Sequence, residues 1–140
     1  MDINKFKEIF ENTTTIGEKI YIENNLAETV KFVKENYHFD ILKEIIAVDN
    51  QENGIELIYR LYSAENEEEA LLATIVRDEV ESVCNIFDSA YADEKEIYDL
   101  FGVRFVGNQE LKRLYMPEDW KGHPLRKDYM ENDERLNWND

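Results

Sequence analysis

The sequence predicts an α+β fold: a two-layer domain with helices packed on a mixed, largely antiparallel sheet, followed by an extended C-terminal arm. Three consecutive strand-length segments are rich in β-branched and aromatic residues, helical periodicity flanks them, and all periodicity ends after Gly107. With 140 residues, 43% of them hydrophobic, the chain can fill one core. We expect a compact domain over residues 1–106 and a docking arm over residues 107–140.

The N-terminal third predicts helix, strand and helix in that order. Apolar residues at helical spacing predict a short amphipathic helix that ends near Asn12. The β-branched residues around positions 20–22 predict a strand. A second helix is expected from an N-cap at Asn25, with Glu28 three residues later, to about Tyr37.

The middle of the chain predicts an antiparallel meander. Residues 41–48, 54–63 and 70–77 have the length and composition of strands. Asn53-Gly54 separates the first pair, and a polar run over residues 63–69 separates the second. Consecutive strands joined by such short connections are expected to pair as neighbours.

Two helices are expected after the meander. Val80, Val83 and Phe87 share a helical face, which predicts a helix that ends before Asp88-Ser89. The following segment, ADEKEIYDLFG, has acids in its first turn, an apolar stripe, and Gly102 in the position of a C-terminal cap. It predicts a short capped helix.

The charge and the single cysteine exclude several classes of function. A net charge of −16 repels nucleic-acid backbones and anionic lipids, so we expect no nucleic-acid binding and contact with a membrane only through a partner. Cys84 alone makes neither an internal disulfide nor a CxxC metal site, and its apolar neighbours predict a buried thiol. A reducing cytoplasmic setting is expected.

The residues that could carry chemistry are few. The sequence contains no phosphate-binding glycine loop, HExxH or EF-hand motif, and His38 and His123 are its only imidazoles. Both histidines are expected in loops or turns. Glu94 and Glu96 diverge on a helix and do not share a site, whereas acids suit a helix N-terminus. We expect no catalytic, cofactor-binding or metal-binding residue.

A locally basic region stands out in this acidic chain and favours docking. The stretch from Arg104 to Lys127 contains six basic and three acidic residues, a net charge of 6 − 3 = +3. The basic residues are Arg104, Lys112, Arg113, Lys121, Arg126 and Lys127.

Residues 94–129, EKEIYDLFGVRFVGNQELKRLYMPEDWKGHPLRKDY, closely resemble the signature of the C subunit (30-kDa subunit) family of NADH:quinone oxidoreductase, respiratory complex I. The resemblance implies a non-catalytic subunit that packs against a D-type (49-kDa) subunit, with B-type and I-type iron–sulfur subunits nearby. Iron–sulfur clusters and flavin are then expected in partner subunits. The complex is expected to lie peripherally on the cytoplasmic side of the cell membrane.

The resemblance also implies a partner interface, made of the signature helix and the arm. Aromatic residues are expected to anchor it, arginines to bind carboxylates, and prolines to keep the arm extended. The interface residues expected are Glu94, Glu96, Tyr98, Asp99, Phe101, Arg113, Pro117, Asp119, Trp120, His123, Pro124, Arg126, Asp128 and Tyr129.

Departures from the signature keep alternatives open. Lys95 stands where the family has arginine, and residues 107–111, GNQEL, lack the usual histidine and proline. A short chain with a relaxed motif also resembles the equivalent subunit of energy-converting membrane-bound hydrogenases, whose large subunit would hold a NiFe centre. Other hypotheses are a small hydrolase using His123 with Asp119 or Asp128, and an acidic domain without an obligate partner.

Overall fold

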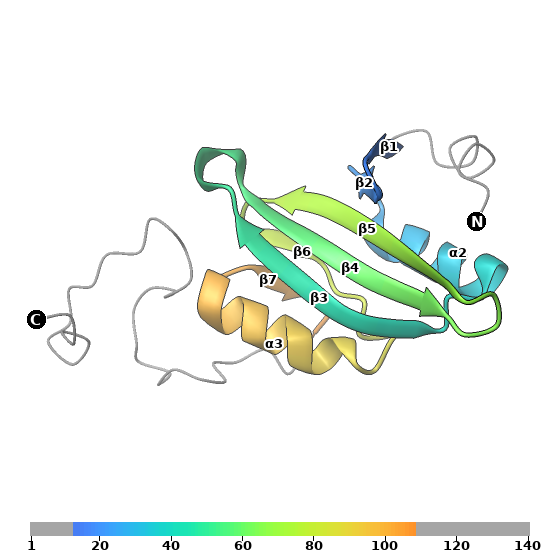
Figure 1. Ribbon diagram of the computed structural model, residues 1–140. Helices are drawn as coiled ribbons and strands as arrows, with labels where there is room; N and C mark the ends of the chain where they lie inside the picture. The colour runs from blue at the N-terminus through green and yellow to red at the C-terminus, as the bar shows by residue number, and fades with distance from the viewer. Residues whose placement is uncertain (1–12, 109–140) are drawn as a thin grey trace, which may run out of the picture.

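A computed structural model describes residues 13–108 of the chain (Figure 1). The helix predicted before Asn12 and most of the predicted arm lie outside these residues, and the domain boundary at residue 106 stays a prediction. The elements are β1 (Thr13–Ile16), β2 (Lys19–Ile22), α2 (Leu26–Tyr37), β3 (Ile41–Asp49), the 3-10 helix η1 (Gln51–Asn53), β4 (Ile55–Ser63), β5 (Glu68–Val76), β6 (Glu79–Glu81), α3 (Ala90–Phe101) and β7 (Arg104–Val106).

The main sheet has five strands in the order β1-β2-β5-β4-β3. All neighbouring strands are antiparallel except β2 and β5, which run parallel. The predicted meander is therefore confirmed as β3, β4 and β5. Its first connection requires Gly54, whose φ is 91° and whose added Cβ would lie 2.8 Å from the Val76 carbonyl oxygen. The sheet is mixed and largely antiparallel, as predicted.

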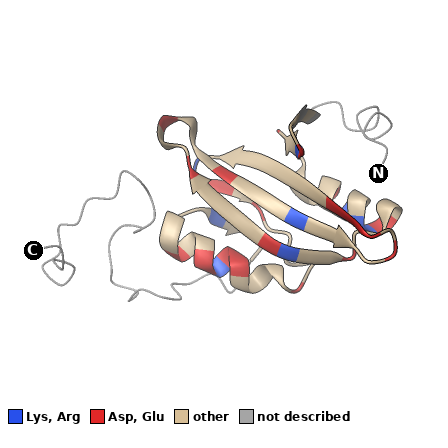
Figure 2. Cartoon of the chain, viewed as in Figure 1, with Lys and Arg blue, Asp and Glu red and all other residues tan. Residues whose placement is uncertain are grey.

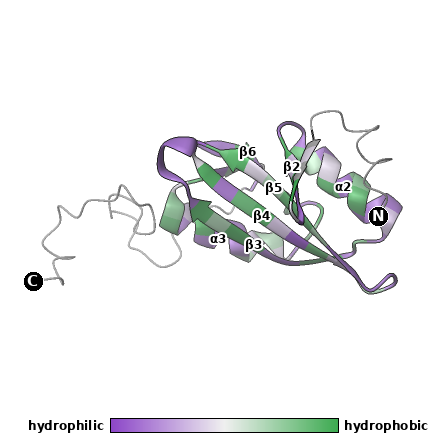
Figure 3. Ribbon diagram, turned by 45° about the horizontal axis from the view of Figure 1, so that its top comes forward, coloured by the Kyte–Doolittle hydropathy of each residue, from purple (hydrophilic) through white to green (hydrophobic). Residues whose placement is uncertain are grey.

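The core lies on one face of this sheet. Apolar and polar residues alternate along the strands, as the bands in Figure 3 show. In β4, Leu57, Tyr59 and Leu61 are fully buried. They share the core with buried residues of α2, such as Val30, and of α3, such as Ile97. Because both helices pack against the inward-facing set of strand residues, they cover the same face, and the α+β prediction is confirmed.

The helix predicted over residues 80–87 is wrong. Val80 lies in β6, which pairs in parallel with β7 through Val80 and Phe105, and α3 connects the two strands. Val83 and Phe87 have helical spacing for a different reason. They belong to two consecutive turns, and both side chains are buried in the core. A strand only three residues long, whose partner follows a whole helix, leaves no local periodicity to detect.

The predicted cap is present at the end of α3 but not at the start of α2. As predicted, α3 ends at Gly102, which has φ 78° and donates its N–H to the Tyr98 carbonyl. Helix α2 begins directly after Asn25, but Asn25 has φ 59° and its side chain makes no cap hydrogen bond. Instead the Thr29 hydroxyl donates to the Asn25 carbonyl at 2.8 Å. The start of α2 was predicted correctly and its capping was not.

Candidate interface and the buried Glu94 network

The structure describes five of the predicted interface residues, all in α3. Glu96 is exposed, and Tyr98 and Phe101 are half-buried. Glu94 and Asp99 are completely buried, and the Glu94 carboxylate faces donors inside the domain. The other nine lie outside the described residues and stay predictions: Arg113, Pro117, Asp119, Trp120, His123, Pro124, Arg126, Asp128 and Tyr129.

The Glu94 carboxylate accepts three hydrogen bonds inside the domain. The Ser82 hydroxyl donates to Oε1 at 2.6 Å, and Asn108 Nδ2 donates to the same oxygen at 3.0 Å. The Val83 backbone N–H donates to Oε2 at 2.9 Å. These residues come from α3, from the segment after β6 and from the segment after β7. One carboxylate therefore joins three parts of the chain, which we call the Glu94 network.

The electrostatics of the Glu94 network are governed by burial. Removal from water raises the pKa of Glu94, while the donors Ser82, Val83 and Asn108 act in the opposite direction. The Tyr59 hydroxyl is also buried and has no hydrogen-bond partner within the described part of the chain. Burial, followed by the nearby charge of Glu94, raises the pKa of Tyr59. Burial therefore shifts the pKa of both groups upward.

The same region holds the last described residues in place. The Ser82 N–H donates to the Val106 carbonyl at 2.8 Å, and the buried Cys84 thiol lies 4.0 Å from the Gly107 carbonyl oxygen. Asn108 is 6% exposed. The chain therefore leaves the described domain from a position held against the segment after β6.

Sequence reasoning missed Ser82 and Asn108. It assigned Glu94 to a helix N-terminus and, through the family resemblance, to the partner interface. One signal was present: Ala90, Glu94 and Ile97 follow one another at spacings of four and three residues, so Glu94 interrupts an apolar stripe. A carboxylate inside such a stripe indicates a buried polar contact, although it does not identify the donor.

Helix α3 also covers part of the edge of β3. Asp93 Oδ2 accepts the Ile45 N–H at 3.1 Å, and the Ser89 hydroxyl donates to the Leu42 carbonyl at 3.2 Å. Partial burial is the main cause that raises the pKa of Asp93; its bond with Ile45 opposes this, and the neighbouring carboxylates Glu96 and Glu44 add to it. A groove of about 340 Å³ runs between β3 and α3.

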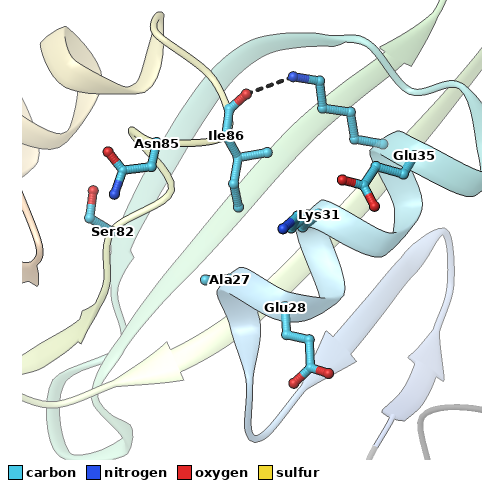
Figure 4. Close-up of a pocket in the computed structure, with 8 residues that line it drawn as sticks. Ala27, Glu28, Lys31, Glu35, Ser82, Asn85 and Ile86 are labelled. Carbon is cyan, nitrogen blue, oxygen red and sulfur yellow. Dashed lines mark hydrogen bonds between the residues drawn. The ribbon is translucent and has the colours of Figure 1, made fainter.

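A second hollow, of about 540 Å³, lies between α2 and residues 82–86 (Figure 4). Lys34 Nζ donates to the Ile86 carbonyl at 2.8 Å and ties the helix to this segment. The walls carry charges of both signs, including Lys31 and Glu35, beside polar Asn85. This mixture selects no particular class of ligand.

Cys84 and His38 are the remaining candidate residues within the described part of the chain. Cys84 is buried, at 1% exposure. His38 follows α2 in a left-handed conformation, with its Nδ1 3.3 Å from Glu65 Oε2. Residues 13–108 contain no group of three or more His, Cys, Asp or Glu side chains placed to hold a metal ion. Within the same residues, no helix has the length and apolarity needed to cross a membrane.

The chain is similar to known proteins over most of its length. Residues 20–135 match the family described as "Respiratory-chain NADH dehydrogenase, 30 Kd subunit". The C subunit of NADH-quinone oxidoreductase from Geobacter sulfurreducens is 33% identical over 135 residues, which cover 92% of this chain and 79% of that protein. The C subunit from Moorella thermoacetica is 38% identical over 101 residues, or 69% of this chain and 68% of that protein.

A longer relative is also similar to this chain. The C/D subunit of NADH-quinone oxidoreductase from Phocaeicola vulgatus is 34% identical over 127 residues, which cover 87% of this chain but 24% of that protein. This chain therefore spans about a quarter of the length of that relative. The match over residues 20–135 and the similarity to C subunits over most of both chains place the protein in the 30 Kd subunit family of respiratory-chain NADH dehydrogenase.

Proposed function

We propose that this chain is a non-catalytic structural subunit of the peripheral arm of a complex I-type NADH:quinone oxidoreductase, and that it docks onto a D-type subunit. The observation that carries the proposal is its similarity to C subunits of NADH-quinone oxidoreductase along most of its length. In this role the chain supports electron transfer from NADH to quinone, coupled to ion translocation, without handling electrons itself.

The longer relative, named as a C/D subunit, supports the choice of partner. Its name assigns two subunits to one polypeptide, and this chain matches a part of it that corresponds to the separate C subunits of the other relatives. Linking two modules in one chain raises their effective concentration for each other and suits modules that bind directly. A D-type subunit is therefore the partner we propose, with B-type and I-type iron–sulfur subunits nearby.

The residue inventory supports a role without redox chemistry. Iron–sulfur clusters are usually held by four cysteine thiolates, and this sequence has one cysteine and two histidines. We propose that the clusters and the flavin are bound by partner subunits, and that the chain reaches the cytoplasmic side of the membrane only as part of the complex.

The Glu94 network supports a continuous docking surface. It holds Asn108, the last described residue, against the N-terminal half of α3. Glu96 is exposed on that helix, and Phe101 is half-buried at its end. We propose that these side chains and the arm contact the partner together, with Trp120 and Arg126 as principal contacts.

Purification of the native complex through a tag on this chain tests the proposal. We expect a D-type subunit, with iron and flavin in the complex but not in the separated chain. A large subunit that contains nickel would favour the hydrogenase alternative, and recovery of the chain without any large subunit would overturn the proposal. Trp120→Ala with Arg126→Ala should reduce recovery of the partner, whereas Lys31→Ala, at an exposed position on α2, is the control.

A further inference from the structure

We propose that the open part of the β3 edge binds an extended segment of the partner subunit as an additional strand, and that this segment carries basic residues. The proposal rests on the proposed function for the identity of the partner. Its own evidence is the hydrogen-bonding direction of β3, the groove beside β3, and the charges around that groove.

The β3–β4 hairpin shows which backbone groups of β3 point outward. The Asn50 N–H donates to the Gly54 carbonyl at 2.9 Å, which makes this a hydrogen-bonded pair. Antiparallel pairs alternate, so the pairs formed by Val48 and Ile46 are hydrogen-bonded to β4. The N–H and carbonyl groups of Ala47 therefore point away from β4.

The position of Ile45 confirms this alternation independently. Ile45 is two residues before Ala47, and its N–H leaves the sheet to reach Asp93. Together with the Ser89 bond to Leu42, this contact covers the first half of the edge. No comparable contact from residues 13–108 reaches the N–H of Ala47. Helix α3 thus covers one half of the edge and leaves the other half open.

An open edge without protection is unusual in a soluble domain. Natural edges are commonly blocked by lysine, proline or a bulge, because unpaired backbone groups bind other chains. The irregularity in β3 lies between Leu42 and Glu44, in the covered half. Residues 46–48 of the other half read IAV and contain no lysine, proline or bulge. This half is suited to pairing with another strand.

The surroundings specify the side chains of the added strand. On one side the groove is lined by Ile97, Leu100 and Phe101 of α3. On the other face of the sheet, Ile46 and Val48 are 38% and 40% exposed. A strand at this edge places alternate side chains against these two surfaces. Its apolar residues are therefore expected on both of its faces at the centre of the contact.

The charges around the groove favour a basic segment. Asp93, Glu96 and Glu44 all line it. Acidic positions outnumber basic ones on α3, and β3 carries acidic positions with a basic one beside them (Figure 2). The chain as a whole carries −16. Lysine or arginine residues at the ends of the added strand would reduce this repulsion, whereas an acidic segment would increase it.

Amide hydrogen exchange in the isolated chain and in the purified complex tests the pairing directly. We expect exchange at Ala47 to slow by at least about tenfold in the complex, because its N–H gains a partner. The Ile45 amide, already bonded to Asp93, should be protected in both states. An Ala47 amide that exchanges equally fast in both states would overturn the proposal while leaving docking to a D-type subunit intact.

A proline substitution tests the same bond through affinity. Ala47→Pro removes the outward N–H, and an edge position tolerates proline because the β4 ladder does not use that group. We expect the variant to bind the D-type subunit about tenfold more weakly, as the loss of about one hydrogen bond predicts. Ala47→Ser keeps the N–H and is the matched control. Equal affinities would overturn the proposal, and if Ala47→Pro does not fold, the exchange result decides.

Further measurements distinguish a basic partner segment from a second copy of this chain, and the further inference from the proposed function. Charge reversal by Glu96→Lys should weaken the association several-fold, and a stronger association would contradict a basic partner segment. Protection of the Ala47 amide that rises with the concentration of the isolated chain would assign the edge to a second copy and overturn the partner assignment. Failure of the wild-type chain to bind any D-type subunit would instead contradict the proposed function.

Discussion

Asn108 Nδ2 donates a hydrogen bond of 3.0 Å to Glu94 Oε1, and both residues are buried. The bond joins the second turn of α3 to the last described residue of the chain. Because Ser82 and Val83 bind the same carboxylate, one buried side chain helps to fix the position at which the chain leaves the described domain. This arrangement leads to the first two predictions.

Removal of the Glu94 carboxylate should destabilise the domain. Glu94→Ala leaves the three donors without their acceptor and creates a cavity, so we expect a loss of about 2–4 kcal/mol in the free energy of unfolding. Glu94→Gln keeps an acceptor oxygen and should lose less. Urea denaturation measures both variants. Glu96→Gln, on the exposed side of the same helix, should change stability by less than about 0.5 kcal/mol; an equal loss in that control would refute the special role of Glu94.

The pH dependence of stability should carry the signature of a raised Glu94 pKa. Burial makes the folded state bind a proton at Glu94 more readily than the unfolded state does. The contribution of Glu94 to stability is therefore fully present below its unfolded pKa and is lost as the pH rises through the folded pKa. Because Glu94→Gln does not titrate there, the wild type should gain stability relative to this variant as the pH falls from about 7 to about 4. The opposite trend would mean that the hydrogen bonds outweigh burial.

Alanine substitutions at two glycines, Gly54 and the control Gly17, test the β3–β4 hairpin that orients the β3 edge. Gly54→Ala places a Cβ 2.8 Å from the Val76 carbonyl oxygen at a φ of 91°, so we expect a loss of about 2–3 kcal/mol. At Gly17, where φ is 62° and no atom lies within 4 Å of an added Cβ, alanine should cost only about 1 kcal/mol. Equal losses in thermal unfolding would contradict the close approach at Gly54.

The Cys84 thiol should be protected from reagents in the native chain. It is 1% exposed and lies against the segment that ends at Asn108, so a disulfide reagent should react only when this region opens. The labelling rate of native protein, compared with that of protein in denaturant, measures the protection. Rapid native labelling would mean that the segment around Gly107 opens easily. Glu94→Gln should speed up labelling if the Glu94 network closes this region.

The elements predicted correctly are those with a local signal. The β3–β5 meander shows β-branched composition with turns at fixed places, and α3 carries both an apolar stripe and Gly102 at its end. The family resemblance was also a local signal, because it rests on one unbroken segment. Residues far apart in sequence were not needed for any of these predictions.

The elements missed depend on distant partners. The strand β6 exists because β7 pairs with it after an intervening helix, and Val80 was assigned to a helix from apolar spacing alone. The burial of Glu94 likewise depends on Ser82 and Asn108, which approach it only in the folded chain. No periodicity records such contacts.

The sequence by itself determined the family, the α+β class and the scarcity of redox ligands, because composition and contiguous motifs are written in the chain. Only the tertiary structure decided that Glu94 faces inward, and that α3 bonds to Ile45 on the β3 edge while no hydrogen bond from residues 13–108 reaches the Ala47 N–H. The physical reason is that hydrogen-bond satisfaction and exposure are properties of residues brought together by folding. They depend on which groups meet, and the order of residues in a local segment does not record this.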